Sequence, residues 1–566
     1  MISAENRWLR WTALAAALCA AVMVPVVWDA SQSWIFPDGI SYLDMATAAR
    51  QSPGILLKNA YWSPAYPAIL AVMMAVARPS AATELHAAYA LNWVIFLLAA
   101  GTFTLLLRTV LHDLRRESWP ELDGSSSLVR ALICFAYPFF LVVNLNPTLW
   151  YITPDMLVQA LVYAAAAFAL KLCRPAASWK QSVGLGAVLG VGYLTKAAMF
   201  PLALILLAIL FVRSPDRPAR RNALIAAACF GAVAAPLVVS LSLEKHRFTF
   251  GDSGKLNYAW FVAGIPPYSG WRGQPPENGT PVHPHHIVGE APLILEFRAP
   301  VPGTLPIWYD PSYWWEGFKT PLSVNRQIGA FLRAFTAAHS TQALLLALAA
   351  VLVSLSLLNK RVRGVVKSGG IQTWILLAWP LSACLMYSLV LFNLRYIVAY
   401  IVMLGLGSAV LFLKPLRPAA RMRILSTATI LLLLVGAARL RPIVLRALHS
   451  DTSGPLTRQE GRDNDASSTA VAQTLFRMGI RPGDEISQLG HSLDCYYARR
   501  AGVRIVAQIW EDPDEFVNLG ASQVQQVLDR LKQLGVKALV SRGKAGFVND
   551  RGWSHVPRTD VYIRPL

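Results

Sequence analysis

Four charged side chains stand almost alone in apolar surroundings in this sequence. They are Asp38 in IFPDGISYL, Asp155 in YITPDMLVQ, Lys196 in GYLTKAAMF and Arg395 in LFNLRYIVAY. An ionisable group at a membrane boundary is costly, so each of the four is a candidate for function. Acids beside cations suit the transfer of a group from a phosphate, because a carboxylate can activate the acceptor while positive charge stabilises the departing phosphate.

Each of these residues also has a structural interpretation. Asp38 and Asp155 could cap helices, and Lys196 or Arg395 could extend its charged end to the membrane surface. We favour the catalytic interpretation because the topology that the charge pattern predicts brings all four residues out at the same membrane face.

The surroundings of Asp38 supply further candidates. Pro37 and Gly39 predict a turn that projects the Asp38 carboxylate, with a helix from Ser41 onward. Asp44 lies six residues after Asp38, so on such a helix the two carboxylates point in different directions. The same region offers three candidates for substrate binding and one for the donor phosphate: Tyr42, Asp44 and Trp62, and Lys58.

A metal site is the weaker alternative. The segment PVHPHHIVGE contains His283, His285 and His286 near Glu290, but their spacing matches no helical ligand motif and Pro284 interrupts it. The acids around residue 40 also lack the Asp-x-Asp spacing typical of a metal that bridges a diphosphate. We therefore expect no cofactor and do not favour a divalent metal.

The composition indicates the elements that must position these residues. The chain has 566 residues, of which 55% are hydrophobic and 15% charged, and its mean hydropathy is +0.42. The apolar residues form long uncharged blocks, which is typical of a protein with many transmembrane helices.

About eleven such stretches predict transmembrane helices, the shortest of them near the lower length limit. They are Trp11–Trp28, Leu85–Leu107, Ala131–Pro154, Met156–Leu170, Gln181–Thr195, Ala197–Val212, Asn222–Leu243, Thr341–Asn359, Ile371–Leu394, Tyr396–Leu413 and Ile424–Ala438.

Charge placement predicts the orientation. With the N-terminus and its Arg7 and Arg10 in the cytoplasm, every second loop is basic, as the positive-inside rule requires. This holds if Ser63–Ala77 stays on the outer side and lies in the membrane interface. Residues 29–84, residues 244–340 and the tail then face outward.

The tail differs from everything before it. Helical patterns at 467–478 and 522–534 alternate with the strand-like stretches DEISQLG, VRIVAQI, VKALVS and DVYIRP. The sequence thus predicts a polytopic α-helical membrane protein, residues 1–444, followed by an extracytoplasmic α/β domain, residues 445–566.

The net charge of +20 arises from 52 Lys and Arg against 32 Asp and Glu. These charges lie in the loops between apolar blocks, as in cytoplasmic connections of polytopic proteins. A nucleic-acid partner is therefore not expected.

The motifs resemble those of the GT-C superfamily of membrane glycosyltransferases, in the branch of protein O-mannosyltransferases and bacterial lipid A aminoarabinose transferases. The resemblance rests on PDGISYLDMA, YWSPAYPAIL, TPD, LTK and RYIVAY, on the order of the spans and on a terminal α/β domain. It covers most of the chain at low sequence similarity. O-mannosyltransferases commonly have paired acids in the first loop, whereas Gly39 follows Asp38 here.

The resemblance implies roles for the isolated charges. Asp38 would be the base or would position the acceptor, Asp155 would be the second outer acid, and Lys196 and Arg395 would hold the phosphate of a polyprenyl-phosphate sugar. The leading hypothesis is an enzyme of the bacterial inner membrane that transfers this sugar to a lipid, glycan or protein acceptor. A transporter or flippase of lipid-linked sugars is the alternative, although neither paired repeats nor midplane charges are evident. A third hypothesis, a sensor or scaffold, leaves the outer acids without a role.

Overall fold

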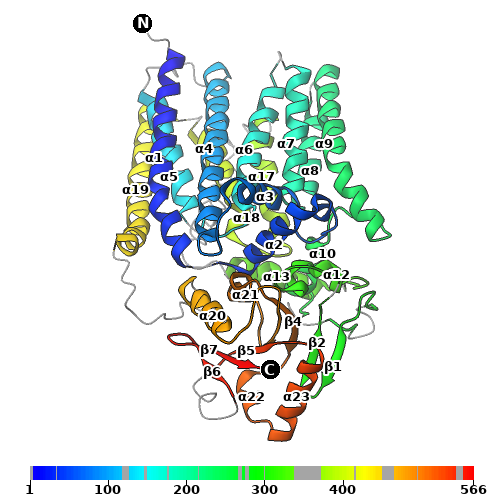
Figure 1. Ribbon diagram of the computed structural model, residues 1–566. Coiled ribbons are helices and arrows are strands. Elements are labelled where there is room, and N and C mark those ends of the chain that lie inside the picture. Colours follow the sequence, from blue (N-terminus) through cyan, green and yellow to red (C-terminus); the bar gives the residue numbers. More distant parts are fainter. Residues whose placement is uncertain are drawn as a thin grey trace.

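The computed structural model consists of a bundle of long helices with a mixed α/β region at one end (Figure 1). The structure describes residues 4–33, 35–117, 127–145, 149–174, 177–214, 216–265, 271–273, 279–298, 300–320, 322–336, 371–413, 416–448, 465–493, 495–543 and 552–566.

The bundle is built from the apolar stretches of the sequence. Its helices are α1 (Ala4–Ser33), α4 (Glu84–Glu117), α5 (Ser127–Asn144), α6 (Asp155–Leu172), α7 (Trp179–Thr195), α8 (Met199–Arg213), α9 (Arg217–Glu244), α17 (Trp379–Ser388), α18 (Leu394–Leu413) and α19 (Pro418–Leu448). The short α16 (Ile371–Thr373) and a π-helical turn, η3 (Trp374–Ala378), lead into α17.

Every predicted stretch that falls within the described residues coincides with helix, although Ala131–Pro154 is helical only to Asn144 and Ile371–Leu394 only to Ser388. Thr341–Asn359 lies outside the described residues. Six of the described helices are long and apolar enough to cross a membrane. The chain is therefore a multi-pass membrane protein, and the count of eleven spans stays a prediction.

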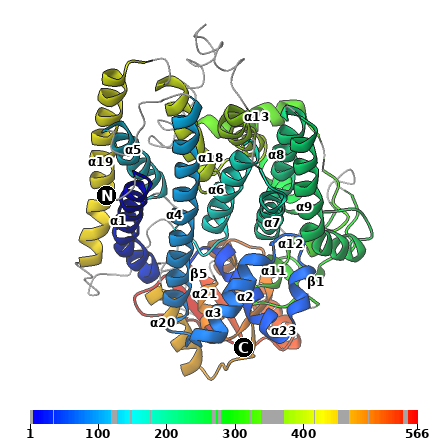
Figure 2. The ribbon, with the colours of Figure 1, turned by 90° about the horizontal axis from the view of Figure 1, so that it is seen from above.

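The helices are not equally buried. In the most apolar part of α6 and of α18, 83% and 78% of the residues are buried, against 11% in α19. Figure 2, which views the bundle from above, shows α19 at the edge and α6 near the middle. The two central helices carry Asp155 and Arg395 at their first turns, so the best-packed elements of the bundle position these charges.

Glycines allow two of the helices to approach closely. A Cβ atom on Gly186 of α7 would lie 2.4 Å from the carbonyl oxygen of Ala226 in α9, and one on Gly190 would lie 2.5 Å from Val233 Cβ. Small residues at helix contacts are typical of membrane bundles, where packing replaces the hydrophobic driving force.

Three short elements follow α1: α2 (Pro37–Gln51), the 3₁₀ turn η1 (Pro53–Leu57) and α3 (Ala65–Ala77). They run across the lower part of the bundle rather than along it (Figure 1). The 13 residues of α3 extend roughly 20 Å, less than the thickness of a bilayer core. The interfacial position predicted for Ser63–Ala77 thus coincides with a helix too short to span.

A second outer segment follows α9. It contains α10 (Ser253–Phe261), the strands β1 (His286–Glu290) and β2 (Leu293–Glu296), the single turns α11 (Pro306–Tyr309) and α12 (Pro311–Trp314), and the longer helix α13 (Val324–Thr336).

The α/β region contains one seven-stranded sheet in the order β1-β2-β4-β3-β5-β7-β6. Its remaining strands are β3 (Glu485–Leu489), β4 (Arg504–Ile509), β5 (Ala538–Arg542), β6 (Ser554–His555) and β7 (Val561–Pro565), and its helices are α20 (Asp465–Arg477), α21 (Tyr496–Ala501), α22 (Pro513–Val517) and α23 (Ala521–Gln533). The central strands β4, β3 and β5 are parallel, and β2 pairs antiparallel with β4. The sequence did not predict that β1 and β2, from the second outer segment, complete the sheet of the tail.

Candidate active site

The four isolated charges predicted from the sequence meet in one chain of ion pairs. Arg395 Nη2 lies 2.9 Å from Asp38 Oδ2, and Arg395 Nε lies 3.5 Å from Asp155 Oδ2. Asp155 Oδ1 lies 2.5 Å from Lys196 Nζ. Two acids and two cations therefore alternate, and the group as a whole is close to neutral.

Asp38 occupies the first turn of α2. The prediction of a turn followed by a helix from Ser41 is wrong, because the helix already begins at Pro37. Proline is favoured at the first helical position, where it loses no hydrogen bond, and the helix N-terminus stabilises the carboxylate beside it. Gly39 serves close packing instead, since a Cβ atom there would lie 3.0 Å from Ile35 Cγ1 and 3.2 Å from Ile152 Cβ.

Asp155 and Lys196 face each other from the ends of two helices. Asp155 begins α6, but its side chain does not cap that helix. It accepts hydrogen bonds from Lys196 and from Thr153 Oγ1, at 2.5 and 2.9 Å. Lys196 follows the last residue of α7, and its Nζ lies 3.5 Å from the centre of the Tyr396 ring. The helix-cap interpretation of Asp155 is thus replaced by an ion pair.

Arg395 is the central member of the chain of charges. Its side chain is 6% exposed, and its guanidinium lies about 5 Å from the ring centres of Phe36, Tyr151 and Tyr396. Its Nη1 has no hydrogen-bond partner among the residues that the structure describes. A buried donor without a partner is costly, and a substrate oxygen would satisfy it.

These residues line a cavity of about 490 Å³. Tyr42 and Trp62, predicted to bind substrate, are part of its wall, and their rings pack edge to face at 5.1 Å. The wall also contains apolar and aromatic residues from α17 and the segment after it, among them Met386, Tyr387 and Leu391. The cavity therefore combines charged side chains with apolar side chains that suit hydrocarbon.

Three further charged residues of the wall were missed in the sequence. Arg247, Asp252 and Lys255 come from the start of the second outer segment. Arg247 pairs with Asp252 at 2.6 Å and with Glu316 at 3.4 Å. In the sequence, Arg247 closely follows the charged residues Glu244 and Lys245, and Asp252 and Lys255 lie in the polar segment DSGKLNYAW, so these charges do not stand out.

Two predicted site residues lie elsewhere. Lys58 is exposed and lines a different cavity, of about 820 Å³, together with Lys245 and His283. Asp44 is buried against Arg499 of α21 at 2.5 Å and also accepts hydrogen bonds from Thr304. The structure thus does not bring Lys58 or Asp44 to the chain of charges.

The three histidines of the predicted metal alternative have separate partners. His283 stacks on Tyr313, His285 on Trp314, and His286 Nδ1 lies 2.5 Å from Glu296 Oε2. Burial lowers the pKa of His285 to about 4. Within the described parts of the chain, no three His, Cys, Asp or Glu side chains are grouped to hold a metal ion.

Burial shifts the pKa values of the acid Asp38 and the base Lys196 in opposite directions, in each case toward the neutral form. It raises the pKa of Asp38 above its ordinary value, although the neighbouring Arg395 guanidinium opposes this shift. It lowers the pKa of Lys196, with Asp155 acting in the opposite sense. A carboxylate with a raised pKa is a stronger base than an exposed aspartate, which suits the removal of a proton from an acceptor.

Comparison with known proteins gives matches in structure. No protein-family model matches the chain, and no curated protein matches it by sequence. The oligosaccharyltransferase of Archaeoglobus fulgidus, tethered with an acceptor peptide containing the NVT sequon, aligns with a TM-score of 0.52 at 12% identity, covering 94% of this chain and 69% of that one. The same enzyme, AglB, in complex with an inhibitory peptide and a dolichol-phosphate, gives 0.50 at 11% identity and the same coverage.

ArnT from Cupriavidus metallidurans, bound to undecaprenyl phosphate, aligns over 98% of both chains at 14% identity with a TM-score of 0.49. The chain therefore shares the fold of the Archaeoglobus fulgidus oligosaccharyltransferase, a member of the GT-C superfamily. This fold agrees with the resemblance that the sequence motifs indicate.

Proposed function

We propose that this protein is an integral-membrane glycosyltransferase that moves a sugar from a polyprenyl phosphate to an acceptor at the outer face of the membrane. The observation that carries the proposal is the chain of ion pairs Asp38–Arg395–Asp155–Lys196 in the wall of a cavity that is also lined by apolar side chains. A lipid-linked sugar phosphate likewise combines a charged phosphate with a hydrocarbon chain.

The cations are suited to the phosphate of the donor. Arg395 Nη1 is a buried donor without a partner among the described residues. Lys196 adds a second positive charge, and its Nζ is paired with Asp155, which also lies beside Arg395. Asp155 would hold both cations in place. The structure of AglB with a dolichol-phosphate supports a donor of this class for a protein of this fold.

The reaction is a displacement at the anomeric carbon of the sugar. Asp38 accepts the proton of the acceptor group, whose electron pair forms the new bond to that carbon. The bond from this carbon to the phosphate oxygen breaks, and its electron pair leaves with the polyprenyl phosphate, whose negative charge Arg395 and Lys196 stabilise. Lipid, glycan and protein acceptors all fit this step.

The proposal includes an orientation in the membrane. The N-terminus would face the cytoplasm of a bacterium, and the cavity and the α/β region would face outward across the inner membrane, as the basic loops predict. Reporter fusions after Ala77 and after Arg116 are expected to report the outer and the cytoplasmic side, respectively.

A reconstitution assay tests the activity. Purified protein in liposomes is supplied with a panel of radiolabelled polyprenyl-phosphate sugars and with an extract of envelope acceptors. We expect at least one donor to be cleaved to free polyprenyl phosphate with transfer of its sugar. Movement of intact donor between leaflets without cleavage would instead support the flippase hypothesis.

A further inference from the structure

Tyr396, next to Arg395 in the first turn of α18, is a polar residue of the cavity that the proposed reaction does not use. Its side chain lines the cavity together with those of Arg395 and Lys196. Tyrosine at the end of a transmembrane helix is commonly an interfacial anchor. The contacts of Tyr396, however, are with the two cations of the site.

The hydroxyl group of Tyr396 binds the guanidinium of Arg395. Arg395 Nη2 donates to Tyr396 Oη at 3.0 Å and also to Asp38 Oδ2 at 2.9 Å. The tyrosine oxygen is the acceptor in this bond, because a guanidinium can only donate, and its own proton remains to be given to another oxygen. Among the residues that the structure describes, no other group is hydrogen-bonded to this hydroxyl. The proton is therefore available to a ligand in the cavity.

The ring of Tyr396 holds the ammonium group of Lys196. Lys196 Nζ lies 3.5 Å from the centre of this ring and 2.5 Å from Asp155 Oδ1. An ammonium above an aromatic face is attracted by the ring, and more strongly where water is excluded. The ring itself packs against Tyr387 of α17, with the ring centres 5.4 Å apart. Tyr396 thus keeps the second cation on the same cavity wall as Arg395.

The Tyr396 hydroxyl and Arg395 Nη1 are both donors without an acceptor within the described part of the chain. Because Nη1 belongs to the guanidinium that binds Tyr396, both donors lie within reach of one phosphate group. The phosphate of a polyprenyl-phosphate sugar carries one negative charge as a diester and gains a second as the sugar leaves. Hydrogen bonds to its oxygens are therefore stronger in the transition state than in the bound donor.

We propose that Tyr396 both binds the phosphate and positions the cations of the site. Its hydroxyl donates a hydrogen bond to a phosphate oxygen of the polyprenyl phosphate, and its ring keeps Lys196 beside Arg395. This role rests on the proposed function, which supplies the phosphate. The two contacts can be separated, because phenylalanine at position 396 keeps the ring whereas leucine removes the ring together with the hydroxyl.

Binding of two lipid probes separates recognition of the phosphate from binding of the hydrocarbon chain. The probes are undecaprenyl phosphate and undecaprenol, which has the same chain and no phosphate, and both are measured with the full-length protein in detergent. For Tyr396→Phe we expect the Kd of undecaprenyl phosphate to rise roughly tenfold, the value of about one hydrogen bond to a charged group. The Kd of undecaprenol should stay at the wild-type value. An unchanged Kd of undecaprenyl phosphate overturns the hydroxyl contact.

Tyr400→Phe is the matched control. Tyr400 lies one turn further along α18, where its hydroxyl donates to Met199 Sδ at 3.3 Å, and it does not line the cavity. Its replacement should leave the Kd of both probes at the wild-type value. A loss of affinity for both probes in Tyr396→Phe would show an effect on the packing of the bundle and would overturn the proposal.

The ring contact is tested by a double-mutant cycle with Lys196. Tyr396→Leu should weaken binding of undecaprenyl phosphate more than Tyr396→Phe does, because Lys196 is then no longer held. In Lys196→Gln, which has no ammonium group, the two substitutions of Tyr396 should have equal effects. A difference that persists in that background overturns the role of the ring, and the Kd of undecaprenol shows whether each variant is folded.

The same data distinguish failure of this role from failure of the proposed function. If the wild-type protein binds undecaprenyl phosphate no more tightly than undecaprenol, the proposed class of donor fails, and the role of Tyr396 fails with it. If the wild-type protein prefers the phosphate and every variant of Tyr396 keeps this preference undiminished, only the role of Tyr396 is rejected.

Discussion

At the scale of single residues, Asp38 is the group on which the proposed chemistry depends most. Its carboxylate is buried at the start of α2, is held by Arg395 and lines the cavity. Asp38→Asn keeps the shape of the side chain and a hydrogen bond to Arg395 but removes the base. We predict that donor affinity is retained while kcat falls by a factor on the order of a hundred or more. The measurement is steady-state turnover with a donor that the wild type cleaves.

Asp529→Asn is the matched control, because Asp529 is an exposed aspartate of α23 that accepts a hydrogen bond from Gln525 and does not line the cavity. Near-normal turnover of Asp38→Asn would remove Asp38 from the mechanism. The pH profile gives a second criterion. A base is active when deprotonated, so the rate should fall as pH drops through the pKa of Asp38, which burial raises above its ordinary value. This acidic limb should be absent in Asp38→Asn.

Arg395 allows a prediction about the donor phosphate. The guanidinium offers a planar set of donors, of which Nη2 is used by Asp38 and Nη1 is unused among the described residues. Lysine keeps the charge but loses this geometry. We predict that Arg395→Ala weakens donor binding by a factor of roughly ten or more, the value of about one charge-assisted hydrogen bond, and that Arg395→Lys weakens it less.

Donor affinity is read from binding of the polyprenyl-phosphate sugar to purified protein in detergent. Arg530→Ala, which removes an arginine from α23 in the α/β region, is the control. Equal affinity in wild type, Arg395→Ala and Arg395→Lys would assign Arg395 a purely structural role in the chain of charges.

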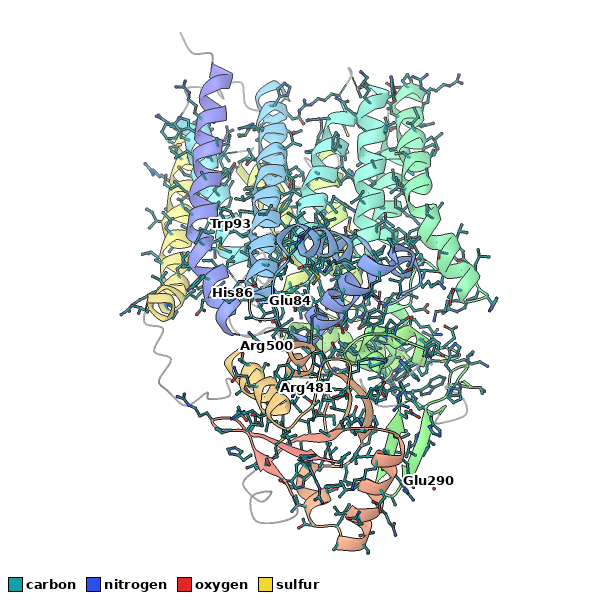
Figure 3. All side chains as sticks on the ribbon, viewed as in Figure 1. Glu84, His86, Trp93, Glu290, Arg481 and Arg500 are labelled. Carbon is teal, nitrogen blue, oxygen red and sulfur yellow. The ribbon has the colours of Figure 1, made fainter. Side chains whose placement is uncertain are left out.

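At the scale of elements, α2 is held from two sides. Its first turn carries Asp38, and six residues later Asp44 meets Arg499 of α21. Arg499 also pairs with Glu84 at the start of α4, at 2.5 Å. Figure 3 shows Glu84, the first residue of α4, close to Arg500 of α21. The α/β region thus fixes the helix that carries the proposed base.

We predict that Arg499→Lys lowers both the unfolding temperature and kcat. The lysine cannot reach two carboxylates in the same geometry, and complete loss of the arginine would leave the buried Asp44 without its ion pair, a cost of about 3–5 kcal/mol. Thermal unfolding and turnover are the two measurements, with Arg500→Lys as control on the same helix. Wild-type stability and turnover of Arg499→Lys would show that α2 keeps its position without this arginine.

The elements also explain what the sequence could predict. Asp155 and Arg395 stand out because they interrupt apolar runs, and helix periodicity places each at the end of a central helix. Arg247 and Lys255 are surrounded by polar residues, so no contrast marks them. Arg499 and Asp44 are separated by 455 positions, and a contact that distant depends on the assembled fold. The pairing of β2 with β4 was missed for the same reason.

At the scale of the whole molecule, the charges that line the cavity decide whether a metal ion is needed to neutralise the donor phosphate. A phosphate donor needs positive charge, and Lys196, Arg395, Arg247 and Lys255 all line the cavity wall. We predict that transfer activity survives EDTA, since these cations can neutralise a monophosphate donor. Activity that EDTA abolishes and Mg²⁺ or Mn²⁺ restores would contradict this account and would make Asp155 a candidate metal ligand.

The strand pairing between β2 and β4 has a consequence for the threading of the chain. Backbone hydrogen bonds join residues 294–296 to residues 507–509, so both segments lie on the same side of the membrane. A chain that returns to the side it left must cross an even number of times, and four predicted stretches lie between these strands. The ion pair of Glu84 with Arg499 imposes the same parity on the six stretches between Glu84 and β2. Adding or removing a single membrane crossing in either interval would separate residues that are in contact. These contacts therefore constrain the topology independently of the positive-inside rule.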